Sequence, residues 1–507
     1  MRKRPAFVLV VSFALFAPAC ARAPRPVTVP STTAASGSVD ALRRDLAAIF
    51  GQPAFNHSIW AVLVESTVSG QPLFELNSSK LVMPASNMKL LTLSAAAEMF
   101  GWDHTFETRL VSSAPLEAGT LRGDLIVIGG GDPSIGERGE PRGVLQSWAQ
   151  QLWDAGVRAI DGRIVGDDDQ FDDEGIVPGW SWDDIPYGFA APVGALEYNE
   201  GSVDLVVRAG AAAGAPVSIE VRPGASGLTI ENDLITSAEG GILSLTLRRL
   251  PGSQHLRVAG QVPARTPEFV RTASVDNPTE FFVSALRSAL MARGISVAGG
   301  AVDIDQIVPH PDSAGARLLL SHRSPPLAEL AGTMMKFSQN LYAESLLKAL
   351  AAREGIGTTD LGRRMVREIL RTWGVSGDSV VMADGSGLSR YNYVTPEVIV
   401  RILQHLHEDP AHAEAFVPTL PVAGQDGTLF RRMQGTAAEN NVRAKTGTLA
   451  NVRALSGYVT TKDAEVLVFS IIANNFNVSA AAIDEAADRA LVRLAGFTRT
   501  AGPGRPR

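Results

Sequence analysis

The first apolar runs of the folded chain predict a β-hairpin followed by a helix. Residues 60–65 and 73–76 are apolar and β-prone, and they flank the turn-forming sequence Ser69-Gly70-Gln71-Pro72. Residues 86–100 then have the spacing of a helix, and Gly101 follows them as a stop signal.

The middle of the chain has a different pattern. Between residues 103 and 317, short β-prone runs at 125–128, 203–207, 217–221 and 243–247 alternate with Gly and Pro. Two helical patterns interrupt them, at residues 144–155 and 278–293. This stretch is predicted to be inserted domain material.

Helical spacing returns from residue 326, at residues 327–354, 361–373 and 396–408. Two β-prone runs follow, at 453–460 and 465–473, and a turn at 461–464 joins them. An amphipathic helix is predicted at residues 479–495.

Length and composition favour a globular protein of two or three folding units, because 507 residues exceed an ordinary single domain. The chain is 45% hydrophobic and 20% charged, with 48 Gly and 30 Pro, which argues against disorder, collagen and a multi-span membrane protein. Its 46 Lys and Arg against 53 Asp and Glu give a net charge of -7. We therefore expect no nucleic-acid partner.

The N-terminus has the composition of an export signal. Arg2, Lys3 and Arg4 precede an apolar stretch at residues 6–16 and small residues up to Ala19. Residues 1–19 are therefore predicted to be a signal peptide, and the mature protein is expected in the periplasm or another extracytoplasmic space. Residues 20–38 suit a flexible linker, the folded body starts near Val39, and residues 501–507 form a tail.

Cys20 is the only cysteine, so no intrachain disulfide can form and stability must come from core burial. Two alternatives stay open for it. Either Cys20 is lipidated, which would attach the protein peripherally to a membrane, or cleavage nearby, for instance after Ala19 or Ala21, releases a soluble chain. Ala17 stands where lipoproteins usually have a Leu-like residue. A diacylated Cys20 peptide would select the first alternative, and an unmodified or absent Cys20 the second.

A candidate nucleophile comes from the pattern Ser-x-x-Lys, which occurs as Ser86-Asn87-Met88-Lys89 and as Ser345-Leu346-Leu347-Lys348. Positions i and i+3 share a helix face, so the Lys89 amine can reach the Ser86 hydroxyl and accept its proton if the lysine pKa is lowered. Pro84 and Ala85 place Ser86 at a helix start. The second copy lies inside a helical run, where we expect an ordinary helix with a solvated lysine.

Two further motifs supply the remaining parts of such a site. In Ser338-Gln339-Asn340, the hydroxyl can relay a proton and the carboxamide of Asn340 can bind a substrate amide. The sequence Lys445-Thr446-Gly447-Thr448 is the rarer one, since Lys-Thr-Gly is expected about 0.04 times in such a chain. On a strand, Gly447 would let a ligand approach the backbone, while Lys445 and the hydroxyls of Thr446 and Thr448 hold a carboxylate.

Together these motifs resemble those of the penicilloyl-serine transferases. The separation of 252 positions from Ser86 to Ser338 makes the chain similar to the class C low-molecular-mass penicillin-binding proteins, the D-alanyl-D-alanine carboxypeptidase/endopeptidase family. The phrases Pro84-Ala85-Ser86-Asn87-Met88-Lys89 and Asp384-Gly385-Ser386-Gly387-Leu388-Ser389-Arg390 are also similar to those of the family. The resemblance covers nearly the whole mature chain.

The resemblance implies an α/β (α+β) penicillin-binding, β-lactamase-like serine transferase fold, in which helices flank an antiparallel sheet. This penicillin-binding domain would comprise residues 39–102 and 318–500. Two nested inserted domains rich in β-strand would interrupt it. Domain II would comprise residues 103–198 and 266–317, and domain III residues 199–265.

The resemblance also implies a reaction, the cleavage of peptidoglycan stem peptides through an acyl-enzyme on Ser86. Lys89 would act as base and Ser338 and Lys445 would complete the proton network, while backbone N–H groups of Ser86 and Thr448 hold the oxyanion. β-Lactams would acylate the same serine as covalent inhibitors.

The family implies one further contact, from an Asp of the second domain and an Arg near the active site to the free end of the substrate's diamino acid. Asp167 and Arg390 are the matching positions. The alternative reading of residues 167–174 is a solvated acidic loop.

Other chemistries fit the sequence less well, and we expect no cofactor and no metal. The glycines before Pro133 lack the Lys of a P-loop, and His405 and His407 lack zinc-site spacing. Two alternative functions stay open, a non-catalytic peptidoglycan-binding or scaffold protein and a β-lactamase. No Glu-x-x-Leu-Asn lies between Asn340 and Lys445 to position a hydrolytic water, so we expect slow deacylation. The sequence does not decide between carboxypeptidase and endopeptidase preference, nor reveal oligomeric state, the diamino acid or the role of domain III.

Overall fold

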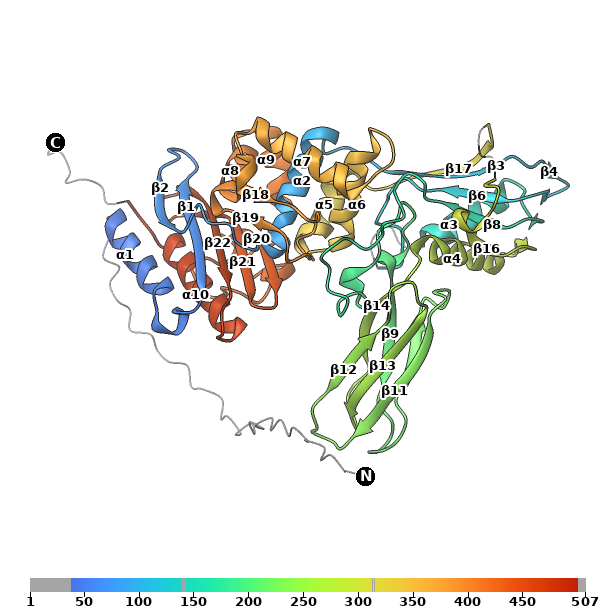
Figure 1. Cartoon of the computed structure of the whole chain (residues 1–507), viewed down its shortest axis with the longest axis horizontal. Helices are drawn as coiled ribbons and strands as arrows, with labels where there is room; N and C mark the ends of the chain where they lie inside the picture. Colours follow the sequence, from blue (N-terminus) through green and yellow to red (C-terminus); the bar gives the residue numbers. More distant parts are fainter. Residues whose placement is uncertain (1–37, 139–142, 312, 314, 500–507) are drawn as a thin grey trace, which may run out of the picture.

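Five antiparallel strands, taken from the two ends of the chain, form the central sheet (Figure 1). The structure is a computed structural model that describes residues 38–138, 143–311, 313 and 315–499. The strand order is β2-β1-β22-β21-β20. The bounds are β1 (Ile59–Ser66), β2 (Pro72–Leu76), β20 (Arg443–Leu449), β21 (Val452–Thr460) and β22 (Val466–Asn474). The hairpin and the two C-terminal strands predicted from the sequence are confirmed.

Helices cover both faces of this sheet, because its strands are apolar on both sides. Trp60, Val62 and Val64 of β1 pack with α1 (Val39–Phe50) and α10 (Ala480–Ala495), whereas Leu63 joins the core of the opposite face. That second core contains the remaining helices of the lobe (Figure 1). They are α2 (Met88–Phe100), α5 (Leu327–Lys336), α6 (Asn340–Ala352), α7 (Thr359–Thr372), α8 (Pro396–Glu408) and α9 (Pro410–Phe416).

The sequence pattern indicated where the folded body starts but not the helix that starts it. Leu42, Leu46 and Phe50 recur at four-residue spacing and are buried against the sheet. The hydroxyl of Ser38 accepts a hydrogen bond from the Ala41 N–H at 3.3 Å and caps the helix.

The inserted region contains a second five-stranded sheet with helices α3 (Val144–Asp154) and α4 (Pro278–Arg293). Its strand order is β16-β8-β6-β3-β17. The bounds are β3 (Glu107–Ser112), β6 (Leu125–Ile128), β8 (Ile164–Asp167), β16 (Ala301–Asp303) and β17 (Arg317–Arg323). A small sheet beside it contains β4 (Leu116–Glu117), β5 (Thr120–Leu121), β7 (Ala159–Ile160) and β15 (Ser296–Val297).

Two three-stranded sheets form the elongated part that projects from the rest of the chain (Figure 1). One contains β9 (Ser202–Arg208), β10 (Ser218–Arg222) and β14 (Phe269–Ser274), and the other β11 (Thr229–Ser237), β12 (Ser244–Arg248) and β13 (His255–Pro263). A short pair, β18 (Val380–Val381) and β19 (Tyr393–Val394), joins the helical core beside the central sheet.

The strand pairing suggests two changes to the domain division expected from the sequence. Strand β17 pairs with β3, so residues 317–323 go with the inserted region, and β14 pairs with β9, so residues 269–274 go with the projecting part. We propose boundaries near residues 324 and 275 in place of 318 and 266. The predicted signal peptide, Cys20, almost all of the linker and the tail lie outside the described residues.

The helix predicted over residues 327–354 is broken, and the break carries a motif. Helices α5 and α6 are separate, and Ser338 between them has a left-handed φ of 61°. This backbone conformation is uncommon for a residue with a Cβ atom. Similarly, the helix predicted from Ser86 starts with a 3₁₀ turn, Ala85–Asn87, before α2 begins at Met88.

Close packing of α7 on α6 predicts a difference between two glycine substitutions. A Cβ atom at Gly362 would lie 2.2 Å from the carbonyl oxygen of Leu347, so Gly362→Ala should lower the free energy of unfolding by about 1–3 kcal/mol. Gly332 in α5 has no such neighbour within 4 Å, so Gly332→Ala should be neutral or stabilise by up to about 1 kcal/mol. Denaturant unfolding of the two variants checks this, and equal effects would contradict it.

Candidate active site

Ser86 and Lys89 form the contact that their spacing predicts. Ser86 is partly exposed in the 3₁₀ turn, and the Nζ atom of Lys89 donates to its Oγ atom at 3.1 Å. The same Nζ atom lies 2.6 Å from Oδ1 of Asn340 and 2.8 Å from the carbonyl oxygen of Ser386. An ammonium has three N–H donors, so these three acceptors fix its position completely.

Burial determines the charge state of Lys89. The side chain has no exposed surface, and this burial lowers its pKa to about 7, although the charges of Glu344 and Asp384 oppose the shift. A lysine with this pKa is partly neutral near pH 7. Its amine can therefore accept the proton of the Ser86 hydroxyl, which an ordinary protonated lysine cannot do.

Ser338 and Lys445 form a second buried pair beside the first. The Nζ atom of Lys445 donates to Oγ of Ser338 and to the carbonyl oxygen of Thr446, both at 2.8 Å. Burial lowers the pKa of Lys445 well below its usual value, and the charge of Lys89 lowers it further. The left-handed turn at Ser338 is thus the local conformation that brings its hydroxyl to this lysine.

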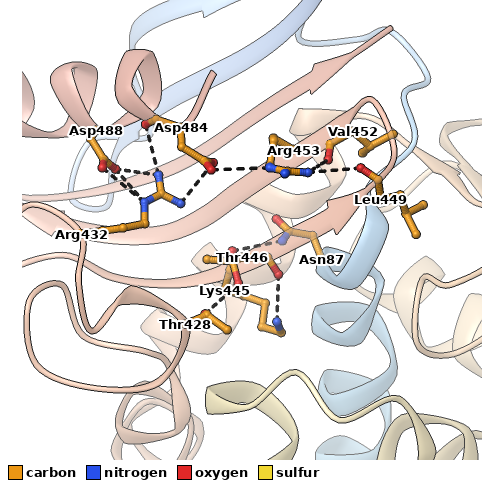
Figure 2. A network of polar contacts seen from close by, with 10 residues as sticks. All are labelled: Asn87, Thr428, Arg432, Lys445, Thr446, Leu449, Val452, Arg453, Asp484 and Asp488. Carbon is orange, nitrogen blue, oxygen red and sulfur yellow. Dashed lines mark hydrogen bonds and ion pairs between the residues drawn. The ribbon is translucent and has the colours of Figure 1, made fainter. Parts of the chain in front are cut away.

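Strand β20 lies directly against the turn that carries Ser86. A Cβ atom at Gly447 would stand 2.6 Å from the carbonyl oxygen of Pro84, so glycine permits the approach. The side-chain amide of Asn87 donates to the carbonyl oxygen of Lys445 at 3.0 Å (Figure 2). The hydroxyl of Thr446 contacts that of Thr428 at 2.7 Å. Thr448, two residues further along β20, is exposed.

An ion-pair network on the other side of the β20–β21 hairpin holds this strand in place. Figure 2 shows Arg453 donating to backbone carbonyls of the hairpin turn, including that of Val452 at 2.9 Å. Arg453 also lies 3.5 Å from Asp484 of α10, and Arg432 binds both Asp484 and Asp488, the latter at 2.6 Å. Helix α10 therefore anchors the hairpin that carries Lys445.

Two buried carboxylates near Lys89 were not identified from the sequence. Glu344 accepts hydrogen bonds from the backbone N–H groups of Gly385 and Ser386, at 2.9 and 2.7 Å. Asp384 accepts those of Gly387 and Ser389, at 2.7 and 2.6 Å. Burial and the charge of Asp384 raise the pKa of Glu344 to about 7. Glu344 stands four residues after Asn340, a spacing that could have indicated a shared helix face.

The structure gives Asp167 and Arg390 different neighbours. Asp167 ends β8 in the inserted region, where burial and the charge of Asp169 raise its pKa. Arg390 is exposed and donates to the carbonyl oxygen of Ala450 at 2.8 Å. Burial raises the pKa of Asp184, and the charge of Arg390 opposes that shift. Asp167 therefore stays a prediction for the substrate contact, and Asp184 is a second carboxylate of the inserted region whose charge interacts with that of Arg390.

The expectation of a solvated lysine in the second Ser-x-x-Lys copy is wrong. Ser345 is 0% and Lys348 is 1% exposed, and Lys348 binds Oδ1 of Asp172 at 2.6 Å. The physical reason is that a segment of the inserted region covers this face of α6. The expected solvated acidic loop at residues 167–174 is only partly solvated, since Asp169, Asp173 and Glu174 are exposed whereas Phe171 is buried and Asp172 binds Lys348.

One group of carboxylates in the described residues has the geometry to hold a cation. Oxygen atoms of Asp168, Asp303 and Asp305, in the inserted region, lie within 4.8 Å of one another. The hydroxyl of Thr279 donates to Asp168 at 2.5 Å and the amide of Asn277 to Asp303 at 2.7 Å. These carboxylates are separate from the contacts of Ser86. The expectation of a metal-free reaction stays a prediction that loss of activity on chelation would contradict.

Comparison with known proteins gives one consistent result. A model of the D-Ala-D-Ala carboxypeptidase 3 (S13) family matches residues 42–496. A D-alanyl-D-alanine carboxypeptidase from Actinomadura sp. is 35% identical over 487 residues, which cover 94% of this chain and 88% of that protein.

Solved structures show the same similarity. The crystal structure of penicillin binding protein 4 from Haemophilus influenzae has a TM-score of 0.78 and 27% identity, covering 90% of this chain and 99% of that chain. A second structure of that protein, complexed with a novel beta-lactam, has a TM-score of 0.71 at 27% identity, covering 88% of this chain and 97% of that chain.

The lowered pKa of Lys89 predicts a pH dependence for covalent reaction at Ser86. Only the neutral amine can accept the serine proton, so the acylation rate should rise with pH through about 7 and gain about tenfold between pH ~6 and pH ~8. Stopped-flow measurement with a fluorescent penicillin checks this. A rate that does not change over this pH range would contradict the assignment of Lys89 as base.

Proposed function

The chain belongs to the D-Ala-D-Ala carboxypeptidase 3 (S13) family and is a serine-type D-Ala-D-Ala carboxypeptidase, and from this premise we propose that Ser86 is its nucleophile. The observation that carries the proposal is the 3.1 Å contact between the Ser86 hydroxyl and Lys89, whose pKa is lowered to about 7. It combines a partly exposed hydroxyl with a base that can be neutral at physiological pH.

Acylation follows from this pair. The Ser86 Oγ atom attacks the carbonyl carbon between two D-alanines while its proton passes to the Nζ atom of Lys89. Backbone N–H groups of Ser86 and Thr448 hold the oxyanion. The C–N bond then breaks, and the departing D-alanine amine takes a proton from the Ser338 hydroxyl, which the Lys445 Nζ atom 2.8 Å away replaces. Water hydrolyses the resulting ester. In this hydrolysis, Lys89 returns its proton to the Ser86 Oγ atom, and the proton that water releases restores Lys445.

Substrate binding uses the groups around β20. The charge of Lys445 and the hydroxyls of Thr446 and Thr448 hold the terminal carboxylate, and Gly447 permits its approach. Asn340 already donates one N–H to the carbonyl oxygen of Phe189 at 2.7 Å. A carboxamide has two such donors, so its second N–H serves the substrate amide.

The side chain of the stem peptide has its own contacts in this proposal. Arg390 binds the free end of the diamino acid together with a carboxylate of the inserted region, for which Asp167 and Asp184 are the two candidates. DD-endopeptidase activity on cross-linked peptides belongs to the same proposal, because the same D-Ala carbonyl is attacked.

β-Lactams are proposed to acylate Ser86. Penicillin binding protein 4 of Haemophilus influenzae has been solved with a β-lactam, and that protein aligns with 88% of this chain. The intact pairs of Ser86 with Lys89 and Ser338 with Lys445 weigh against a purely non-catalytic scaffold. The expected slow deacylation weighs against a β-lactamase.

A cell-wall peptidase acts outside the cytoplasm, and the predicted export signal agrees with this. No helix within the described ranges is long and apolar enough to cross a membrane. A lipid anchor at Cys20 stays a proposal, with mass spectrometry of the mature N-terminus as its test.

Incubation with a labelled penicillin tests the nucleophile. We expect intact and peptide mass spectrometry to find one stable adduct, on Ser86, and none in Ser86→Ala, because the variant deletes the attacking hydroxyl. The fold should change little. Ser345→Ala is the matched control from the second Ser-x-x-Lys copy, and it should label like the natural protein.

Other outcomes would identify the alternatives. Loss of labelling in Ser345→Ala instead would show that the wrong motif was chosen. No adduct with unconsumed penicillin would favour a scaffold, and no adduct with consumed penicillin a β-lactamase.

A further inference from the structure

Helix α6 presents three buried polar side chains at four-residue intervals, Asn340, Glu344 and Lys348. This spacing places all three on one face of the helix. Asn340 holds the amine of Lys89, and Glu344 holds the backbone next to the Ser386 carbonyl that Lys89 also contacts. Lys348, two turns from Asn340, has no part in the reaction described above.

The hydrogen bonds of the Lys348 side chain all go to one segment of the inserted region, residues 172–193. Its Nζ atom donates to Oδ1 of Asp172 at 2.6 Å and to the carbonyl oxygens of Asp172 and Glu174 at 3.1 Å. The carbonyl oxygen of Val193 lies 3.4 Å away. The side chain is 1% exposed, so its charge is desolvated and depends on these acceptors.

These acceptors belong to both ends of the segment. The N–H of Val193 donates to the carbonyl oxygen of Gly175 at 3.0 Å, so residues 172–193 form a loop whose ends meet. Lys348 binds the first end through Asp172 and Glu174 and the second through Val193. The lysine therefore closes the neck of the 172–193 loop.

The far part of the same loop borders the active site. The Phe189 carbonyl oxygen accepts from Asn340 at 2.7 Å, and the indole of Trp180 donates to Asp384 at 3.0 Å. Val177 and Trp180 also pack with residues from three elements of the site in one apolar cluster. Those residues are Leu341 of α6, Leu388 beside the Asp384 loop, and Leu449 at the end of β20.

We propose that Lys348 is a positioning residue for substrate, which acts by holding the neck of the 172–193 loop so that the loop forms one wall of the binding site. The loop also borders the active site through Phe189 and Trp180, so the placement of the substrate depends on it. The contacts of Ser86, Lys89 and Lys445 do not include the loop neck. The inference rests on the proposed function, because it requires that a stem peptide lies at Ser86.

The test applies two probes to the natural protein and to Lys348→Met, a variant that removes the charge and keeps the length of the side chain. A Lys-D-Ala-D-Ala tripeptide with a free side-chain amine reports on the loop wall, and we expect its KM to rise by about tenfold or more while kcat changes less than about threefold. Acylation by 6-aminopenicillanic acid, a β-lactam without an acyl side chain, should change less than about threefold.

Matched variants distinguish loss of the Lys348–Asp172 ion pair from a general loss of structure. Lys80→Met changes an exposed lysine, and it should leave both probes unchanged. Asp172→Asn weakens the same ion pair by changing its acidic partner, because the Asp172 carboxylate contacts Lys348 at 2.6 Å. It should raise KM in the same direction and tests the proposal even if Lys348→Met fails to fold. In the double variant, KM should match that of Lys348→Met alone, since Asp172 acts through the lysine.

Hydrogen exchange provides a readout independent of substrate. The amides of residues 172–193, including that of Val193, should exchange faster in Lys348→Met, while those of the central sheet keep their rates. An unchanged tripeptide KM in the variants, or an equal loss with both probes, would overturn the inference. Failure of the natural protein to be acylated by 6-aminopenicillanic acid would instead overturn the proposed function, so the two failures are distinguishable.

Discussion

The active site depends on burying two lysine amines side by side. Neither Lys89 nor Lys445 has exposed surface, and desolvation lowers the pKa of both. A buried amine is tolerated only where acceptors surround it, and here each acceptor comes from a different element. The Ser86 turn, the start of α6 and the loop at Ser386 hold Lys89, and the turn at Ser338 holds Lys445. The separated parts of the chain must therefore be assembled accurately before the base can exist.

Local patterns were enough to predict much of this assembly. The hairpin, the C-terminal strands and the contact of Ser86 with Lys89 all follow from periodicity or from the i and i+3 geometry of a helix. The break at Ser338 does not follow, because no Gly or Pro interrupts residues 337–340 and helical spacing continues through them. A contact with Lys445, more than a hundred residues away, accompanies that conformation, and a local pattern cannot show such a contact.

The same limit explains the other differences. Lys348 looked solvated because its covering loop lies some 170 residues earlier in the sequence. The boundaries that we propose differ from the expected ones for a similar reason, since β14 and β17 pair with strands far from them in sequence. In each case the deciding partner is distant in sequence, whereas the motifs themselves are local.

The order of the central sheet affects how the protein is made. Strand β22, which stands in the middle of the five, is the last to be synthesised, and β1 on one side of it is the first. The sheet therefore cannot close until nearly the whole polypeptide has emerged, whereas the inserted domains are complete earlier. In a chain that crosses a membrane in an unfolded form, Ser86 and Lys445 would lie far apart and would not yet be part of one site. Such a hydrolase would acquire activity only after its C-terminal end had arrived in the compartment where the enzyme works.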